Sequence, residues 1–365
     1  MSETHPLPET DRRARLLALK LRALVRDHTG APDDALPTES FAPGAALRHG
    51  DDAWALLEPS TDDGRGLGAA LIWASRSRAS SLNVITELGS GVLARRAAEF
   101  TLPTAVWRVD GRALVAAEVA AFAPLAEPSA AHLAFVADIT KAGAVPAIEH
   151  GVVAGEVRGL EVCRVVDASP GGGVGPDGPV VRLEVGAGAH DREAFAIMHG
   201  DVPTHEALSG VVGAVAGARA VHSPAHPLNR LSQERFLRWR LEQEPWLVDL
   251  ASVEPAPPPV PRRNLKDRTP CSALGRRLDG TPVVVVCSVG VDLDLMPYAA
   301  DARLAAAAWG MMRGHELGVW ATGDGLDVVV ALPPRDIVPA TMELAGLLRH
   351  AVTLASVAVS SASGA

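Results

Sequence analysis

The stretch GAALRHGDDAWALLEPS (residues 44–60) decides the fold, because a second stretch, SALGRRLDGTPVVVVCS (residues 272–288), resembles it. Each stretch predicts a strand, a polar turn that contains an acid, and then a strongly apolar strand. When the two are aligned without a gap, the acids of the turns, Asp51 and Asp279, occupy the same place. The resemblance indicates two copies of one α/β unit that can be compared position by position.

The sequence around each stretch supports this interpretation, because each follows a helix rich in Leu and Arg. In the first part we expect helices over 11–28, 67–75 and 91–100 and strands over 53–58, 82–86 and 105–109. In the second part we expect helices over 295–308 and 337–348 and strands over 283–289, 327–332 and 352–359. Strands that alternate with helices of this length favour a mostly parallel or mixed sheet covered on both sides. The helix over 91–100 is expected to carry Arg95 and Arg96 outward.

The predicted fold class is therefore α/β, with two related mixed-sheet units and an inserted α+β segment. We expect the first unit over residues 1–110, the middle segment over 111–231 and the second unit over 232–365. A Pro-rich linker, PAPPPVP, lies at residues 255–261.

The middle segment is expected to contain a β-hairpin. Its strands cover 160–166 and 180–185, and the Gly- and Pro-rich loop DASPGGGVGPDGP joins them. The sequence HDREAFAIMH (residues 190–199) then predicts a short helix. The segment is either a small separate element or an elaboration packed on the first unit.

The composition is that of a folded protein and limits the function classes. The chain has 365 residues, 48% hydrophobic and 21% charged, and a net charge of −9. This charge disfavours unassisted binding to nucleic acid, although a local basic face remains possible. The arginines of such a face would lie on the first helix, and the alternative is that they only form its solvated surface. They are Arg12, Arg13, Arg15, Arg22 and Arg26.

The remaining bulk features predict a cytoplasmic chain without a membrane span. No apolar stretch approaches the roughly 20 residues of a spanning helix. The polar and acidic start, MSETHPLPET, lacks the apolar region of a signal peptide. The cysteines, Cys163, Cys271 and Cys287, form no CxxC motif and are expected to be buried, reduced thiols.

The order of helix, hairpin, strand, helix and strand resembles the core of the PD-(D/E)xK nuclease superfamily. The segments ERFLRWRLEQEPWLV (residues 234–248) and ALGRRLDGTPVVVV (residues 273–286) carry the resemblance. It implies a site in which two carboxylates hold a divalent metal and a lysine helps to activate water.

This sequence departs from the family pattern in both copies. In the second copy Ser272 or Cys271 replaces the Asp, Val286 the Glu and Ser288 the Lys. In the first copy Glu58 falls at the Glu position, whereas Gly44 replaces the Asp and Ser60 the Lys. The second copy is therefore predicted to be inactive as a nuclease. Glu58 is either a remaining catalytic acid or a carboxylate at the end of a strand.

Three aspartates after the second apolar strand, Asp292, Asp294 and Asp301, form a candidate metal site. Asp292 and Asp294 alternate along an extended segment, so their carboxylates point the same way. With Asp301 they could hold Mg²⁺ or Mn²⁺ at the carboxyl end of a strand, and Asp292 and Asp294 are also catalytic candidates. The alternative is that Asp294 caps the following helix and Asp301 pairs with Arg303 or another cation.

Two further groups are candidates. Arg335 and Asp336 follow the next strand and could bind an anionic ligand, or Asp336 could be an ordinary N-cap. In the middle segment, Glu161 and Glu184 stand on the paired strands and could bind a metal with His190 or Asp191. The alternative to a metal site is that the glutamates are ordinary surface acids and that Asp191 is the N-cap of the short helix.

Three function classes follow from these observations. The first is a catalytically degenerate nuclease-like protein that acts as a scaffold or partner-binding module, with a protein partner or a second copy of itself. The second is a nuclease or phosphodiesterase that depends on a divalent metal and has a relocated acidic site. The third is a small-molecule-binding protein that uses Asp292 and Arg335.

Overall fold

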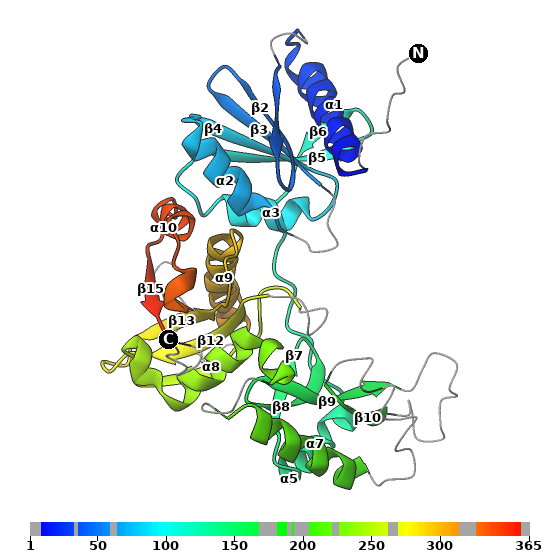
Figure 1. Cartoon of the computed structure of the whole chain (residues 1–365), viewed down its shortest axis with the longest axis vertical. Helices are drawn as coiled ribbons and strands as arrows, with labels where there is room; N and C mark the ends of the chain where they lie inside the picture. The colour runs from blue at the N-terminus through cyan, green and yellow to red at the C-terminus, as the bar shows by residue number, and fades with distance from the viewer. Residues whose placement is uncertain are drawn as a thin grey trace. The chain divides into compact units, whose positions relative to one another are not determined.

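The computed structural model describes residues 9–32, 36–58, 64–167, 181–187, 192, 204–220, 226–261, 269–313 and 326–358. The chain forms two compact units (Figure 1). The first unit consists of Met1–Phe122, Val291–Asp301 and Val338–Val352, and the second of Ala123–Gly290, Ala302–Ile337 and Thr353–Ala365. The expected α/β class is confirmed. Helices alternate with strands along the chain, and the strands pair in both parallel and antiparallel directions.

The first unit contains a sheet whose strands follow chain order. The strands are β1 (Thr38–Phe41), β2 (Gly44–His49), β3 (Asp52–Leu57), β4 (Ser81–Thr86), β5 (Thr104–Asp110) and β6 (Ala113–Ala116). β1, β2 and β3 are antiparallel, β3, β4 and β5 are parallel, and β6 returns antiparallel. The helices of this unit are α1 (Glu9–Thr29), α2 (Leu67–Arg76), α3 (Ser90–Ala97) and α10 (Pro339–Gly346).

Helix α1 covers one face of this sheet through an apolar stripe. Leu21, Leu24 and Val25 recur at helical spacing and are buried. They pack in one cluster with side chains of the sheet that include Trp54 and Leu56. The predicted amphipathic helix therefore forms the core of the unit.

The second unit contains an antiparallel sheet with the order β10-β9-β8-β7. Its strands are β7 (Val145–Glu149), β8 (Val152–Val157), β9 (Leu160–Asp167) and β10 (Val181–Val185). The predicted hairpin is confirmed, because β9 and β10 pair antiparallel with Val181 opposite Asp167. Helices α4 (Ala130–Leu133), α5 (Val136–Lys141) and α7 (Thr204–Ala218) accompany this sheet. The helix predicted over 190–199 lies outside the described residues except for Arg192.

The same unit contains a second sheet with the order β11-β12-β13-β14-β15. Its strands are β11 (Ser252–Pro255), β12 (Cys271–Arg276), β13 (Pro282–Cys287), β14 (Asp327–Leu332) and β15 (Val352–Ser356). Helix α8 (Gln233–Gln243) and the short 3₁₀ turns η2 (Pro227–Arg230) and η3 (Pro245–Val248) precede β11. Helix α9 (Leu295–Arg313) and the 3₁₀ turn η5 (Pro334–Asp336) lie between strands of this sheet in the chain. All residues of β13 are buried, as expected for a β-branched strand covered on both faces.

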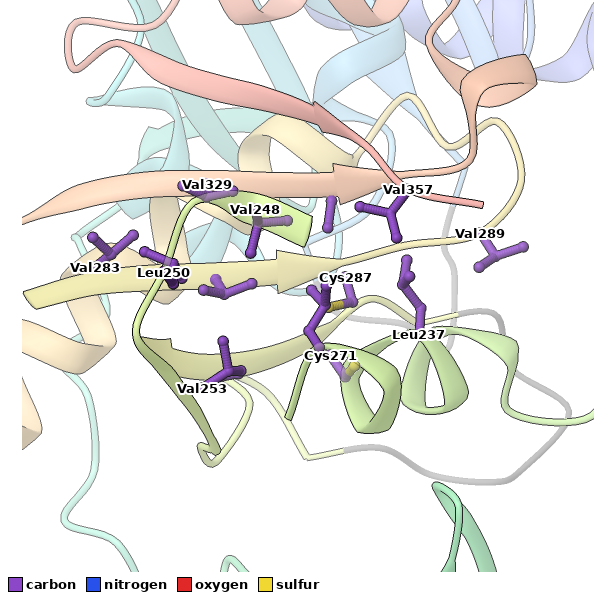
Figure 2. Packing of buried hydrophobic residues seen from close by; sticks show 14 residues of the cluster. Leu237, Val248, Leu250, Val253, Cys271, Val283, Cys287, Val289, Val329 and Val357 are labelled. Atoms are coloured by element: carbon purple, nitrogen blue, oxygen red, sulfur yellow. The ribbon is translucent and has the colours of Figure 1, made fainter. Parts of the chain in front are cut away.

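The core of this sheet lies against α8 (Figure 2). Leu237 and Leu241 of α8 pack with Cys271 and Cys287, which stand directly opposite each other on β12 and β13. The cysteines therefore behave as small apolar core residues, and all three cysteines of the chain are free and buried, as predicted.

The two sheets with parallel strands share one order of elements. α1, β1, β2, β3, α2 and β4 correspond in order and strand direction to α8, β11, β12, β13, α9 and β14. Residues 50–51 join β2 to β3, whereas residues 277–281 join β12 to β13. The hairpins therefore differ in the length of the turn.

This difference makes the ungapped alignment wrong in its second strand. Ala45 and Leu56 pair across β2 and β3 and face α1. Their counterparts facing α8 are the paired residues Ala273 and Val285. The ungapped alignment matches Leu56 with Val284 instead, and neighbouring residues of a strand point to opposite faces. The second strand must be shifted by one residue.

Candidate functional site

In the first unit, the carboxylates of Asp292 and Asp294 face the same guanidinium. Arg65 Nη2 lies 3.0 Å from Asp292 Oδ1, and Arg65 Nε lies 3.9 Å from Asp294 Oδ2. The two side chains therefore share a direction as expected, but from a turn at residues 293–294 and not from an extended segment. Asp294 also accepts the backbone N–H groups of Gly66 and Gly68 at 2.8 and 3.0 Å. Its carboxylate therefore caps α2, while its backbone carbonyl accepts the N–H of Tyr298 at 2.9 Å at the start of α9, the position that the alternative gave it.

Asp301 forms a buried ion-pair cluster instead of joining the other two aspartates. Its carboxylate is fully buried and receives Arg95 Nε at 2.7 Å and Arg96 Nε at 3.1 Å. Arg95 and Arg96, which were expected to point outward, are buried in α3 for this reason. Among the described residues, no group of three His, Cys, Asp or Glu side chains could hold a metal ion. The structure therefore does not bring the three aspartates together into the predicted site.

The other predicted acids near the strands also have partners within the protein. Glu58 follows β3 and forms an ion pair with Arg13 of α1. Because the second strand of the alignment is shifted, Glu58 is not equivalent to Val286. Asp336 accepts the backbone N–H of Gly290 at 2.7 Å and lies in η5, so it does not cap α10, which begins at Pro339.

In the second unit, Glu161 and Glu184 do converge, but an arginine lies between them. Arg192 Nη1 is 2.9 Å from Glu161, and Arg192 Nε is 3.4 Å from Glu184. Arg164 also donates two hydrogen bonds to Glu161, at 2.9 and 2.7 Å. The positive charge between the two carboxylates is therefore that of an arginine side chain, where the sequence predicted a metal ion. His190 and Asp191, the other predicted ligands, lie outside the described residues.

A cleft of about 380 Å³ lies between the two sheets of the second unit. One wall is strand β7 from Val145 to Glu149, the opposite wall is β11 with the prolines after it, and α8 contributes Arg238, Trp239 and Glu242. β7 and β11 are each the last described strand of their sheet. An edge strand carries backbone N–H and C=O groups that no neighbouring strand uses. The cleft thus runs between two strand edges.

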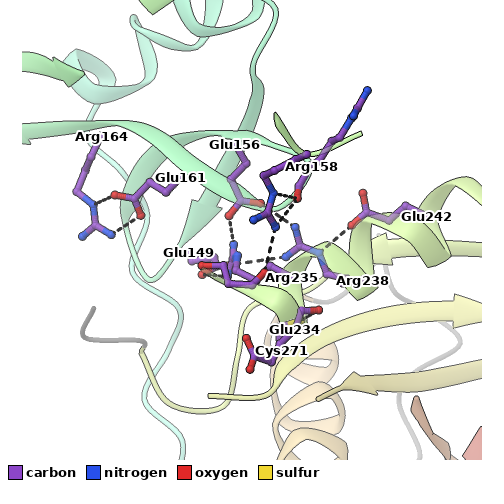
Figure 3. Close-up of polar contacts among 12 residues, drawn as sticks. Glu149, Glu156, Arg158, Glu161, Arg164, Glu234, Arg235, Arg238, Glu242 and Cys271 are labelled. Carbon is purple, nitrogen blue, oxygen red and sulfur yellow. Dashed lines mark hydrogen bonds and ion pairs between the residues drawn. The ribbon is translucent and has the colours of Figure 1, made fainter. Parts of the chain in front are cut away.

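Helix α8 carries the charged groups behind the cleft because its polar residues recur at helical spacing. Arg235, Arg238 and Glu242 are separated by three and four residues and share one side of α8. On the sheet side, Glu149 and Glu156 belong to β7 and β8. Figure 3 shows that these five side chains form one connected network.

The carboxylate of Glu156 is held between two guanidiniums. It forms ion pairs with Arg235 and with Arg238, the latter at 2.8 Å, and all three side chains are at most 5% exposed. Arg235 also donates two hydrogen bonds to Glu149, at 2.7 and 3.1 Å, and Arg238 Nε donates to Glu242 at 2.8 Å. Such paired geometry compensates for removing the charges from water.

Burial and charge act in opposite directions on this network. Burial alone would lower the pKa of Arg235, but Glu156 and Glu149 outweigh it and raise that pKa well above its ordinary value. Burial raises the pKa of Glu242, against the effect of Arg238. The network is therefore a fixed ionic support that holds α8 against β7 and β8.

The surface of the cleft combines apolar and acidic groups. Val145 of β7 is 57% exposed, and Trp239 contacts Arg158, whose guanidinium carbon lies 5.3 Å from the ring centroid. Four carboxylates but only two guanidiniums line the cleft, from Glu149, Glu156, Glu242, Glu254, Arg158 and Arg238. Glu254 is exposed on β11 and forms no ion pair with any residue that the structure describes.

Among the acids of the middle segment, sequence reasoning singled out Glu161 and Glu184 but not Glu149 and Glu156, and it did not find their arginine partners. It took the segment 234–248 as a helix rich in Leu and Arg and gave Arg235 and Arg238 no role. The available signal was the run ERFLRWRLE, in which arginines three residues apart precede a glutamate four residues later.

Comparison of the chain with models of protein families, with curated proteins and with solved structures found no match. Within the described part of the chain, none of the helices combines the length and apolar character needed to cross a membrane.

Proposed function

We propose that this chain is a protein-binding module that takes an extended segment of its partner into the cleft between β7 and β11. The observation that carries the proposal is the open edge of β7 beside a cleft with exposed apolar side chains. An extended peptide that adds to a sheet edge gains main-chain hydrogen bonds, and pockets for alternate side chains select its sequence.

The geometry of the cleft suits this mode of binding. Val145 offers apolar surface at the beginning of β7, and Trp239 offers an aromatic face from α8. The network around Glu156 keeps α8 against the sheet before any partner arrives. A site held in place in this way loses less conformational entropy on binding.

We also propose that the two sheets with parallel strands are copies of one ancestral unit, related to the PD-(D/E)xK superfamily and without its activity. Their common order of helix, three strands, helix and strand supports this proposal. The acids that the sequence singled out as site residues are engaged with arginines or backbone amides wherever the structure describes them, which supports a structural role for them. The three free thiols support a cytoplasmic location.

Selection from a random peptide library tests the proposed function. The full chain is immobilised and offered phage-displayed 12-residue peptides, and the affinity of the enriched peptides is measured by fluorescence anisotropy. We expect that N-methylation of alternate backbone nitrogens of an enriched peptide abolishes binding, because only those nitrogens donate to β7. Failure to enrich any peptide, or equal tolerance of every N-methyl group, would contradict the proposal.

A matched pair of variants locates the binding surface. Val145→Ser removes an exposed apolar side chain from the cleft, and Leu278→Ser removes one from the β12–β13 turn, where Leu278 is 89% exposed. We expect Val145→Ser to weaken binding about fivefold, from the lost apolar contact, and Leu278→Ser to leave it unchanged. Equal affinities of the two variants would place the binding surface elsewhere.

A further inference from the structure

We infer that the segment bound in the cleft is cationic: an extended peptide whose apolar residues contact Val145 and Trp239 and whose Arg or Lys side chain meets Glu254. This inference rests on the proposed function and adds the chemistry of the partner to it.

The balance of charge in the cleft points to a cation. Of the four carboxylates that line it, Glu149 and Glu156 are neutralised by the buried guanidiniums of Arg235 and Arg238. Arg238 also pairs with Glu242, so one arginine serves two carboxylates. The walls therefore keep an excess of negative charge that a basic side chain would balance.

Glu254 is the group best placed to receive that side chain. It stands on β11 at one wall of the cleft and is exposed, and no described residue forms an ion pair with it. By contrast, Glu242 is already occupied, because Arg238 donates to it at 2.8 Å. An arriving guanidinium can form two parallel hydrogen bonds with a free carboxylate, which favours Arg over Lys.

An anionic or purely apolar segment fits less well. A carboxylate of the partner would lie in the same cleft as the carboxylates of Glu254 and Glu242, and these like charges would repel each other. The two arginines that line the cleft are occupied: Arg238 pairs with Glu156, and Arg158 donates to the carbonyl of Ala216 at 2.9 Å. Arg158 keeps its positive charge, because a carbonyl does not neutralise it, but the four carboxylates still exceed the guanidiniums of Arg158, Arg235 and Arg238 by one.

The library selection described above also tests this inference, with charge as the readout. We expect enriched peptides to contain Arg or Lys, and replacement of that residue by Gln and then by Glu to weaken binding in that order. We expect Glu254→Gln to weaken binding about threefold. The matched variant Glu206→Gln removes an equal charge from the exposed surface of α7 and should have no effect.

The outcomes separate the two proposals. If peptides bind the β7 edge but carry no basic residue, or if Glu254→Gln and Glu206→Gln behave alike, the cationic partner is refuted and the proposed function stands. If nothing is enriched, both are refuted. A last variant replaces the basic stretch RRNLKDR (residues 262–268) by a Gly/Ser linker. Binding of basic peptides by this variant alone would show that the occupant belongs to the chain itself, which would overturn the inference of a partner.

Discussion

The carboxylate of Asp294 accepts the backbone N–H of Gly66 at 2.8 Å, although 228 residues separate the two in the chain. Its second oxygen accepts the N–H of Gly68 at 3.0 Å. The first amides of a helix have no partner within the helix, and a carboxylate stabilises them. The segment before α9 therefore supplies a carboxylate that caps the first amides of α2, whose N-cap residue is Gly66.

This cap predicts an unusual dependence of stability on pH. Burial raises the pKa of Asp294, and Asp292 adds to the effect, although the two amides oppose it. Because the folded chain then binds the proton more tightly than the unfolded chain, the contribution of Asp294 to stability is greatest below its ordinary pKa of 3.8 and falls as the pH rises through the folded value.

The change Asp294→Asn keeps a capping side chain and removes the titration. We expect the free energy of unfolding of the wild type, relative to this variant, to decrease from acid to neutral pH. Urea denaturation at a series of pH values measures the difference. A difference that stays constant or increases with pH would show that burial does not dominate at this site.

The second prediction concerns how closely the chain approaches α2. A Cβ atom added to Gly68 would lie 1.8 Å from the carbonyl oxygen of Leu293. We expect Gly68→Ala to destabilise the protein by about 1–3 kcal/mol, because the backbone must move to admit the methyl group. Gly213→Ala is the matched control, since a Cβ at this exposed position of α7 meets nothing within 4 Å.

In this control the same substitution should stabilise the protein by about 0.5–1 kcal/mol through the greater helix propensity of Ala. Thermal and urea denaturation of both variants provide the comparison. If the two substitutions had effects of the same sign and size, the close contact at Gly68 would be refuted.

The third prediction concerns the buried cluster of Asp301, Arg95 and Arg96. Asp301→Asn leaves two buried guanidiniums without a counter-charge, so we expect a loss of about 3–5 kcal/mol of stability. The matched variant Asp110→Asn removes the carboxylate of an exposed pair with Arg108 and should cost less than about 0.5 kcal/mol. Similar losses in the two variants, measured by urea denaturation, would argue against the cluster.

The sequence was most informative about elements with a strong apolar pattern. The helix over 11–28, the hairpin around residues 160–185 and the strand over 327–332 could be predicted because the period of their apolar residues differs between helix and strand. Strands β7 and β8 were missed, although they form one wall of the cleft. Their sequences contain Pro146 and Gly155, which weaken a strand pattern.

The candidate site was harder to predict because its chemistry depends on partners that are distant in sequence. Asp294 and Asp301 were found as acids, but nothing local to them shows that Gly66 or Arg95 will be the partner. An arginine on a short helix such as α3 is usually solvated, and only the tertiary structure buries it beside a carboxylate. The residues that neighbour an acid in the sequence thus show where it lies relative to a strand or helix. Its role depends on partners that only the tertiary structure brings close.

The last prediction concerns Cys163, a fully buried residue of β9. Burial raises the pKa of its thiol to about 12, so at pH 8 about one molecule in ten thousand carries the reactive thiolate. We expect native protein treated with iodoacetamide at pH 8 to leave the peptide containing Cys163 unmodified, as measured by mass spectrometry. Urea should make the same peptide react fully. In the variant Leu278→Cys, alkylation of the exposed new thiol confirms that the reagent is active in the same sample. Rapid alkylation of Cys163 in the native protein of that sample would contradict the burial of β9.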